Sequence, residues 1–131
     1  MASVLIVDDD PLLSRLYSRT LTHEGFIVEV AENGQEGLEK AKAFQPDIIL
    51  LDIMMPKLNG IDTLTNLKAN AQTKKIPVVM LTNLADSHTK SRTLEQGAVH
   101  YIIKTKHSPA AIAVLLKEVL NKRSESSNGV I

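Results

Sequence analysis

The sequence predicts an α/β fold in which a parallel sheet carries helices on both faces, a doubly wound arrangement. Short apolar runs alternate along the chain with longer amphipathic stretches. The apolar runs, each a predicted strand, cover residues 4–7, 27–30, 48–51, 78–81 and 99–103. Several of them are nearly continuous in apolar residues and rich in Val and Ile, as expected of strands that are buried on both faces. Five strand–helix units in a row therefore favour one five-stranded parallel sheet.

The first helix is expected to begin directly after the first strand. Asp10 and Pro11 have the residue types of an N-cap and of a first helical residue. The residues then expected on one face of this helix are Leu13, Leu16, Tyr17 and Thr20.

Each of the other four helices is predicted from a start signal or from apolar residues at helical spacing. The starts are Asn33-Gly34 for the second helix, about Gly60 for the third, Ser87 for the fourth and Ser108-Pro109 for the fifth. The apolar positions are Leu38 and Ala41, then Leu64 and Leu67, then Ile112, Leu115, Leu116 and Val119. Gly97 is expected to stop the fourth helix after Gln96.

Composition limits the class of protein. The chain has 131 residues, 44% of them hydrophobic, which is enough for one domain with one core. Its 15 basic and 15 acidic residues balance, which argues against direct nucleic-acid binding, and cysteine is absent. The first apolar run is too short for a signal peptide, and no stretch approaches the roughly 20 apolar residues of a membrane span. We therefore expect a cytoplasmic protein without membrane insertion.

The C-terminal segment differs from the rest in composition. From about residue 122 it is mostly polar and has no helical or strand periodicity. We expect one domain over residues 1–122, followed by a flexible tail or linker stub over residues 123–131.

Charged and polar side chains stand where the predicted strands end. They are Asp8 and Asp9 after the first strand, Asp52 after the third, Thr82 at the end of the fourth and Lys104 after the fifth. Ligand sites of such sheets lie outside the carboxyl ends of the strands, so these side chains are expected to converge. Asp10 is interpreted as a helix cap and is given no chemical role.

Carboxylates gathered at one edge of the sheet repel one another. A like-charged pair about 4 Å apart costs roughly 4 kcal/mol at an effective dielectric constant near 20, a cost that a divalent cation removes. Oxygen ligands without His or Cys suit Mg²⁺. With the Lys104 ammonium and the Thr82 hydroxyl beside it, such a site suits phosphoryl chemistry, in which an Asp carboxylate is the nucleophile.

Four segments together resemble the receiver domain of response regulators, of the chemotaxis type, from bacterial two-component signalling. They are VLIVDDDP at 4–11, DIILLDIMMPKLNG at 47–60, VVMLT at 78–82 and GAVHYIIK at 97–104. The resemblance covers residues from about 3 to 121. It implies a flavodoxin-like three-layer sandwich with the strand order 2-1-3-4-5.

The resemblance also implies roles for single residues. Asp52 is the phosphoacceptor, Asp9 a direct metal ligand and Asp8 a ligand mainly through water. The backbone carbonyl of Met54 would complete the protein's share of the Mg²⁺ shell, and Mn²⁺ is expected to substitute for Mg²⁺. Thr82 and Lys104 are the conformational sensor and the phosphate-binding lysine.

Three further positions follow from the resemblance. Tyr101 occupies the switch aromatic, and Pro56 and Gly60 shape the loop after the phosphoacceptor, where Gly tolerates unusual backbone angles. Met54 and Asn83 flank the expected phosphoryl site. They either set the phosphoryl lifetime through access of water or are variable loop residues.

The function implied is a signalling switch rather than an enzyme that acts on other substrates. A sensor histidine kinase or a phosphotransfer protein gives a phosphoryl group to Asp52, and autodephosphorylation later resets the domain. Phosphorylation changes the surface of the fourth helix, fifth strand and fifth helix, which an output protein reads. A homodimer that forms on phosphorylation is a further partnership that the resemblance allows.

Two alternatives remain beside this interpretation. An Asp-nucleophile phosphatase usually has a second acid two residues after the nucleophile, where this chain has Met54. A receiver-like interaction domain that is never phosphorylated would not need the acids, Thr82 or Lys104. One departure bears on Lys104. Family members usually have a proline after this lysine, joined by a cis peptide bond, whereas this chain has Thr105. The bond between Lys104 and Thr105 is therefore either trans, with Lys104 aimed slightly differently, or cis and strained.

Overall fold

The structure is a computed structural model that describes residues 1–55 and 57–128, with the side chains of residues 1–55 and 57–123. Its strands are β1 (Ser3–Val7), β2 (Ile27–Ala31), β3 (Ile48–Leu51), β4 (Val78–Thr82) and β5 (His100–Ile103). Its helices are α1 (Pro11–His23), α2 (Gly34–Phe44), α3 (Gly60–Ala69), α4 (Ser87–Glu95) and α5 (Pro109–Asn128), with a 3₁₀ turn η1 (Lys104–Lys106). Pro56, expected to shape a loop, lies outside the described residues.

The strands form one parallel sheet in the order β2-β1-β3-β4-β5, as predicted. β1 lies between β2 and β3: Val4 pairs with Val28 of β2 on one side and with Ile48 of β3 on the other. Every residue of β3 and β4 is buried. This explains why these runs are apolar throughout rather than alternating. All strands point the same way, so their carboxyl ends meet at one edge.

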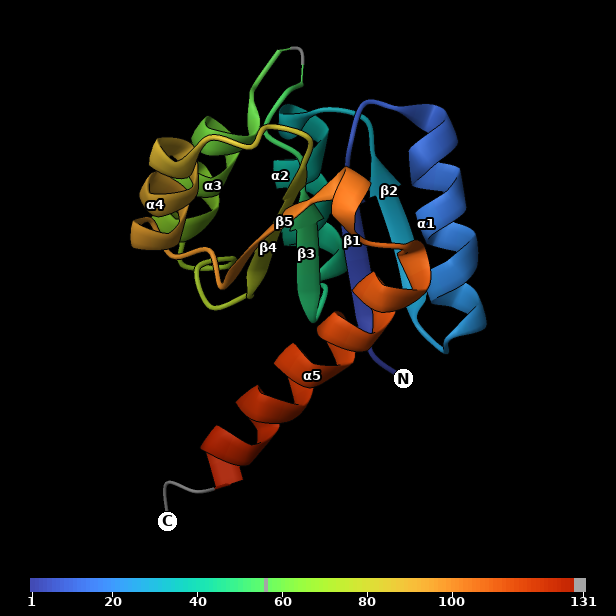
Figure 1. Cartoon of the computed structure of the whole chain (residues 1–131). Coiled ribbons are helices and arrows are strands. Elements are labelled where there is room, and N and C mark those ends of the chain that lie inside the picture. The colour runs from blue at the N-terminus through green and yellow to red at the C-terminus, as the bar shows by residue number, and fades with distance from the viewer. Residues whose placement is uncertain (56, 129–131) are drawn as a thin grey trace.

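Helices cover both faces of the sheet, which gives three layers (Figure 1). On one face α1 and α5 pack over the sheet, with Tyr17 and Leu21 of α1 in the same apolar cluster as Ile112 of α5. On the other face α2 and α3 supply Ala41 and Leu64 to a second cluster. The sheet residues alternate between the two clusters because successive side chains of a strand point to opposite faces.

The start of α1 follows the prediction, but its buried face differs by one position. The Asp10 carboxylate accepts hydrogen bonds from the amides of Leu12 at 3.0 Å and Leu13 at 3.2 Å, so Asp10 is the N-cap. Leu16, expected on the inner face, is 47% exposed. The buried residues of α1 are Ser14, Tyr17 and Leu21, whose spacing of three and four residues defines one helical stripe.

The remaining helix starts also carry side-chain caps. Asn33, Asn59 and Asp86 accept hydrogen bonds from the first turns of α2, α3 and α4. Gly97, at φ 110°, follows the C-cap of α4 and confirms the predicted stop. These caps fix where each helix leaves the sheet edge.

The C-terminal segment is helical further than the sequence indicates. α5 continues to Asn128 and runs beyond the edge of the sheet (Figure 1). The Arg123 guanidinium donates to the Lys75 carbonyl at 2.8 Å, which ties this part of α5 to the turn before β4. Residues 123–128 are therefore part of α5, and the domain boundary expected after residue 122 stays a prediction. Within the described residues, no helix is long and apolar enough to cross a membrane.

Candidate functional site

Three charged side chains from distant parts of the chain meet at the carboxyl edge of the sheet. Asp8 follows β1, Asp52 follows β3, and Lys104 follows β5. The Lys104 ammonium donates to Asp8 Oδ2 at 2.6 Å and to Asp52 Oδ2 at 2.9 Å. The predicted convergence of these strand ends is therefore present.

The backbone holds the two buried acids in place. The Asp8 amide donates to the Ala31 carbonyl and the Asp52 amide to the Val7 carbonyl, each at 3.0 Å, so the ladder continues one residue past the strands. The other oxygen of each carboxylate accepts a hydrogen bond from a nearby backbone amide. Asp8 Oδ1 accepts from the Asp10 amide at 2.9 Å, and Asp52 Oδ1 accepts from the Met54 amide at 3.3 Å. Both carboxylates thus have a fixed orientation toward the edge of the sheet.

Lys104 reaches the acids although a proline is missing after it. The peptide bond between Lys104 and Thr105 is trans, and Lys104 begins the turn η1. The Lys104 side chain is only 7% exposed where it contacts Asp8 and Asp52. The departure at Thr105 therefore does not keep the ammonium from the acidic cluster.

One ammonium shared between two buried carboxylates leaves the site with excess negative charge. Burial raises the pKa of Asp8 above its usual value, and Lys104 offsets only part of that rise. Burial alone would lower the pKa of Lys104, but its hydrogen bonds and its Coulombic attraction to Asp8 and Asp52 together outweigh burial and raise it. Lys104 is thus firmly cationic, and the carboxylates still favour a further positive charge.

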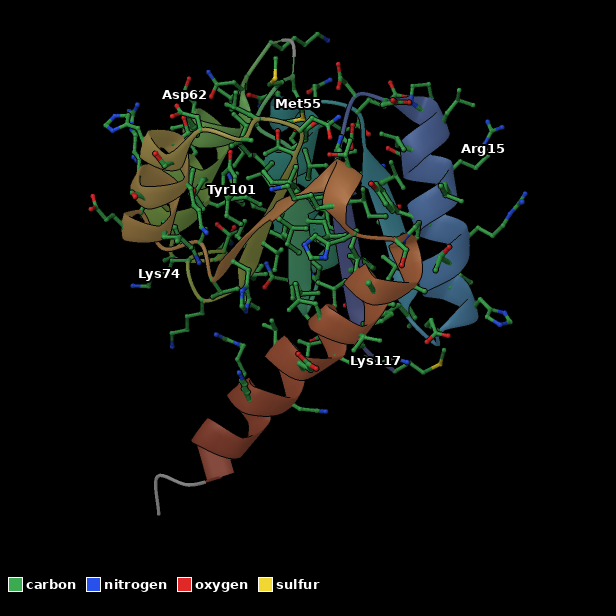
Figure 2. The ribbon with its side chains drawn as sticks, viewed as in Figure 1. Arg15, Met55, Asp62, Lys74, Tyr101 and Lys117 are labelled. Atoms are coloured by element: carbon green, nitrogen blue, oxygen red, sulfur yellow. The ribbon has the colours of Figure 1, made fainter. Side chains whose placement is uncertain are left out.

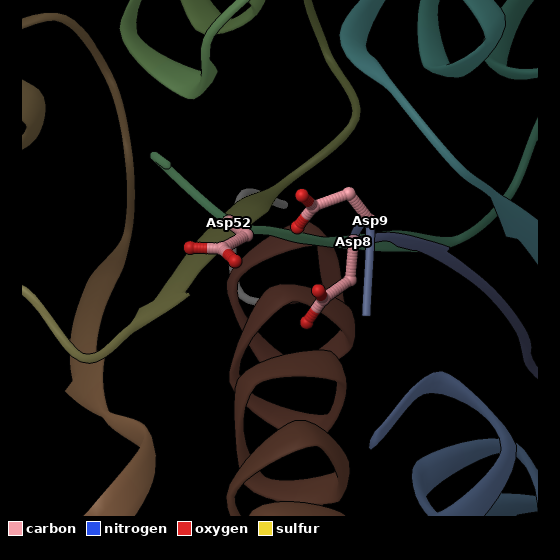
Figure 3. Close-up of side chains that lie close together, drawn as sticks. All are labelled: Asp8, Asp9 and Asp52. Carbon is pink, nitrogen blue, oxygen red and sulfur yellow. The ribbon is translucent and has the colours of Figure 1, made fainter. Parts of the chain in front are cut away.

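Asp9 adds a third carboxylate, so that a metal ion fits the cluster. Asp8, Asp9 and Asp52 each offer an oxygen, and these oxygens lie within 4.8 Å of one another. Figure 3 shows the three carboxylates around a common space. Asp9 is exposed, whereas Asp8 is 3% and Asp52 6% exposed. An all-oxygen donor set with one solvent-facing ligand suits a hard cation that keeps part of its water.

Two grooves lead to the acidic cluster and meet at Asp9. One, of about 420 Å³, is lined by Asp8, Asp9 and the start of α1, including Ser14 and Arg15. The other, of about 500 Å³, runs along the loop after β3 and is lined by Asp9 and Met54. Of the two buried acids, Asp8 is therefore reachable from solvent on the side where Asp9 lies.

Thr82 and Tyr101 are linked through one residue of the loop after β4. The Thr82 hydroxyl, fully buried, accepts the Leu84 amide at 3.3 Å. The Tyr101 hydroxyl, from β5, donates to the Leu84 carbonyl. Leu84 could not be found from the sequence, because its backbone amide and carbonyl make both contacts and residues of other types have the same backbone groups.

Gly60 shapes the loop after β3 for a reason other than the one predicted. A Cβ on Gly60 would lie 2.1 Å from the Asp52 carbonyl oxygen and 2.5 Å from Ile53 Cα. Close approach, rather than an unusual backbone angle, therefore requires glycine here. Among the described residues of this loop, Lys57 is left-handed, at φ 67°.

A family model described as "Response regulator receiver domain" matches residues 4–117. The chain belongs to this family. Solved receiver domains have the same fold: chemotaxis protein CheY4 of Vibrio cholerae is 32% identical, with a TM-score of 0.84, over 91% of this chain and 98% of CheY4. A CheY-like receiver domain protein of Methanospirillum hungatei is 28% identical, with a TM-score of 0.89, over 96% of this chain and 98% of that protein.

The receiver domain also matches longer proteins. Response regulator ArlR of Staphylococcus aureus is 36% identical over 104 residues, which are 79% of this chain and 46% of ArlR. The chain thus spans about half the length of the curated relatives it matches. As a receiver domain of the response-regulator family, the chain has a signalling role.

The two residues expected to flank the phosphoryl site lie at the surface of the receiver domain. Met54 is 62% exposed, beside the groove at Asp9, and Asn83, after Thr82, is also exposed. Both side chains are therefore accessible to solvent, and their effect on phosphoryl lifetime stays a prediction.

Proposed function

We propose that this receiver domain accepts a phosphoryl group on Asp52 from a phosphohistidine of a sensor histidine kinase or phosphotransfer protein, with Mg²⁺ bound. The observation that carries the proposal is the position of the Lys104 ammonium, 2.9 Å from Asp52 Oδ2 and 2.6 Å from Asp8 Oδ2. A carboxylate nucleophile beside an ammonium and a cation site is the arrangement that phosphoryl transfer needs.

In the transfer step an Asp52 carboxylate oxygen attacks the phosphorus of the donor. The new bond joins this oxygen to phosphorus, and the phosphorus–nitrogen bond of the donor breaks with its electron pair left on the imidazole. The Lys104 ammonium already contacts Asp52, so it needs only a small movement to donate to a phosphoryl oxygen. Hydrolysis reverses the state: water attacks the phosphorus, and phosphate leaves the restored carboxylate.

The cation would be held by Asp8, Asp9, Asp52 and the backbone carbonyl of Met54, with Asp9 a direct ligand and Asp8 acting mainly through water. Bound Mg²⁺, or Mn²⁺ in its place, neutralises charge on the phosphoryl oxygens. The proximity of the three carboxylates, within 4.8 Å, supports this ligand set.

The conformational change on phosphorylation would pass through the backbone of Leu84. When the Thr82 hydroxyl turns to a phosphoryl oxygen, the Leu84 amide loses its acceptor and the loop that Tyr101 contacts rearranges. α4 follows this loop and buries only Thr89 and Thr93, so few apolar contacts resist its movement. The surface of α4, β5 and α5 would then differ between the two states, and an output protein reads it.

The partners follow from this role. A kinase or phosphotransfer protein supplies the phosphoryl group, an output protein reads the switched surface, and a homodimer that forms on phosphorylation is a further form. We place the domain in the cytoplasm, with no direct nucleic-acid binding and no membrane insertion. Met54 and Asn83 would set the phosphoryl lifetime by controlling the approach of water.

The test is labelling with a small phosphodonor, acetyl phosphate, with Mg²⁺ present or chelated. Asp52→Asn removes the nucleophile, so label should disappear, and chelation should suppress labelling of the parent. Asp62→Asn, at an exposed position of α3, is the matched control and should label normally (Figure 2). Persistent label on Asp52→Asn would contradict the proposal, and catalytic turnover of phosphate monoesters would favour the phosphatase alternative.

A further inference from the structure

β2 lies at one end of the sheet, so one side of this strand has no neighbouring strand. On its other side it pairs with β1, where the Ile27 amide donates to the Ala2 carbonyl at 2.9 Å. Because the backbone groups of successive residues in a strand point alternately to its two sides, the amides and carbonyls of Val28 and Val30 point away from β1. Such an edge is a template on which another extended strand can pair.

The Lys40 ammonium covers one of these outward groups. It reaches over from α2 and donates to the Val30 carbonyl at 2.5 Å. Two carboxylates hold it there: Glu36, one turn earlier on α2, lies 3.2 Å from the ammonium, and Glu29 of β2 itself lies 3.9 Å from it. The ammonium thus occupies the position that the amide of a pairing strand would need. Displacing it would break a charge-assisted hydrogen bond.

The β2 edge of a second copy of the chain offers the matching donors and acceptors. Two identical edges pair about a two-fold axis, so the two strands would run antiparallel. The register that pairs both outward residues sets Val28 opposite Val30 of the second copy, and it sets the two Glu29 side chains opposite each other. Such pairing would cover Ile27, which is 48% exposed, and would remove apolar surface from water.

Charge opposes this pairing at two points. The two Glu29 carboxylates would lie directly opposite each other, which is unfavourable, and the Lys40 ammonium would have to leave the Val30 carbonyl. We propose that the β2 edge is a strand-pairing surface for a second copy of this chain and that Lys40 keeps it closed. β2 and β5 lie at opposite ends of the sheet, so this surface is separate from the one proposed to change on phosphorylation.

The test compares the self-association of Glu29→Gln and Glu29→Gln/Lys40→Met by sedimentation equilibrium, with chelator and without a phosphodonor. The first change removes the like-charge repulsion, and the second removes the ammonium. The dissociation constant of the dimer should fall about a hundredfold, because two ammonium–carbonyl hydrogen bonds no longer have to break and each corresponds to about tenfold. Glu29→Gln/Lys42→Met, changed at an exposed lysine of α2, is the control and should match Glu29→Gln. Equal dissociation constants with and without Lys40 would overturn the inference.

Two further variants locate the association on this edge. Val30→Pro removes an outward amide that β1 does not use, so adding it to Glu29→Gln/Lys40→Met should restore the monomer. The chain has no cysteine, so Glu29→Cys introduces a single thiol at the centre of the predicted register. Under mild oxidation Glu29→Cys/Lys40→Met should form a disulfide-linked dimer, and Glu29→Cys with Lys40 in place should form far less. A dimer that persists with Val30→Pro, or equal cross-linking with and without Lys40, would contradict the proposed surface.

Discussion

At the scale of single residues, the site is organised by an imbalance of charge. Asp8 and Asp52 are nearly buried and share one ammonium, and Asp9 adds a third carboxylate at the surface. Lys104 is therefore both the anchor of the site in the absence of a cation and the group expected to contact the phosphoryl oxygen. A buried charge whose only partner is removed is costly, so the residues of this site are coupled in stability as well as in chemistry.

Lys104→Met should lower the free energy of unfolding by about 3 kcal/mol in the presence of a chelator, because two buried carboxylates lose their cation. Saturating Mg²⁺ should recover part of this loss by binding to the same carboxylates. Urea denaturation with chelator and with Mg²⁺ measures both effects. Lys106→Met, at an exposed position of η1, is the control. A variant as stable as the parent in chelator would contradict the charge balance described here.

Asp8 makes stability depend on pH. Its raised pKa means that the folded protein binds the proton more tightly than the unfolded chain does. The resulting contribution to stability is present below the usual value of 3.8 and is lost as pH rises through the folded pKa. Asp8→Asn avoids this loss, so without divalent cations it should be more stable than the parent at about pH 7.

The advantage of Asp8→Asn should shrink as pH falls toward 3.8, where Asp8 in the parent is protonated as well. Thermal unfolding of both proteins across this range, with chelator, is the measurement. Asp62→Asn, exposed on α3, should show no comparable trend. An advantage that did not vary with pH would be at odds with burial of Asp8 as its cause.

At the scale of elements, the site depends on how closely α3 approaches the end of β3. The Gly60 amide donates to the Ile53 carbonyl at 2.9 Å, and Gly60 leaves no room for a side chain against Asp52. The two helices differ in what they bury: α3 buries Leu64 and Leu67, whereas α4 buries two threonines. α3 is thus fixed beside Asp52, the proposed phosphoacceptor, while α4 has little that holds it in one position.

Gly60→Ala should destabilise the fold and disturb Asp52 together. The added methyl group would meet backbone atoms of Asp52 and Ile53, which cannot rotate away, so we expect a loss of about 3 kcal/mol and slower phosphorylation. Gly25→Ala is the matched control: φ is 98° and nothing lies within 4 Å, so only backbone strain of about 1 kcal/mol is expected. Urea denaturation and acetyl phosphate labelling measure the pair. Equal labelling of both variants would contradict the proposed role of α3.

At the scale of the whole molecule, the sequence predicts the features that depend on apolar periodicity and on which residues follow each strand. The five strands and the meeting of Asp8, Asp52 and Lys104 follow from apolar runs and from the rule for parallel sheets, whereas the strand order was implied by the resemblance to receiver domains. Leu16 was assigned to the wrong face because a stripe shifted by one residue fits the same spacing.

Other features had no signal in residue type. The sharing of Lys104 between two acids depends on the path of η1, and the link through Leu84 uses backbone groups. The helix at residues 123–128 lacks apolar periodicity because α5 runs beyond the sheet there, where no apolar stripe is needed (Figure 1). Such features follow from the three-dimensional path of the chain rather than from local patterns.

The central claim is that folding gathers these groups around one nucleophile. The most direct measurement treats the acetyl phosphate-labelled protein with borohydride, which reduces an aspartyl phosphate to homoserine, and then locates the altered residue by mass spectrometry. We predict a single altered position, Asp52, that appears only when Mg²⁺ is present. Reduction at another acid, or reduction at Asp52 that is equally strong in chelator, would contradict the account.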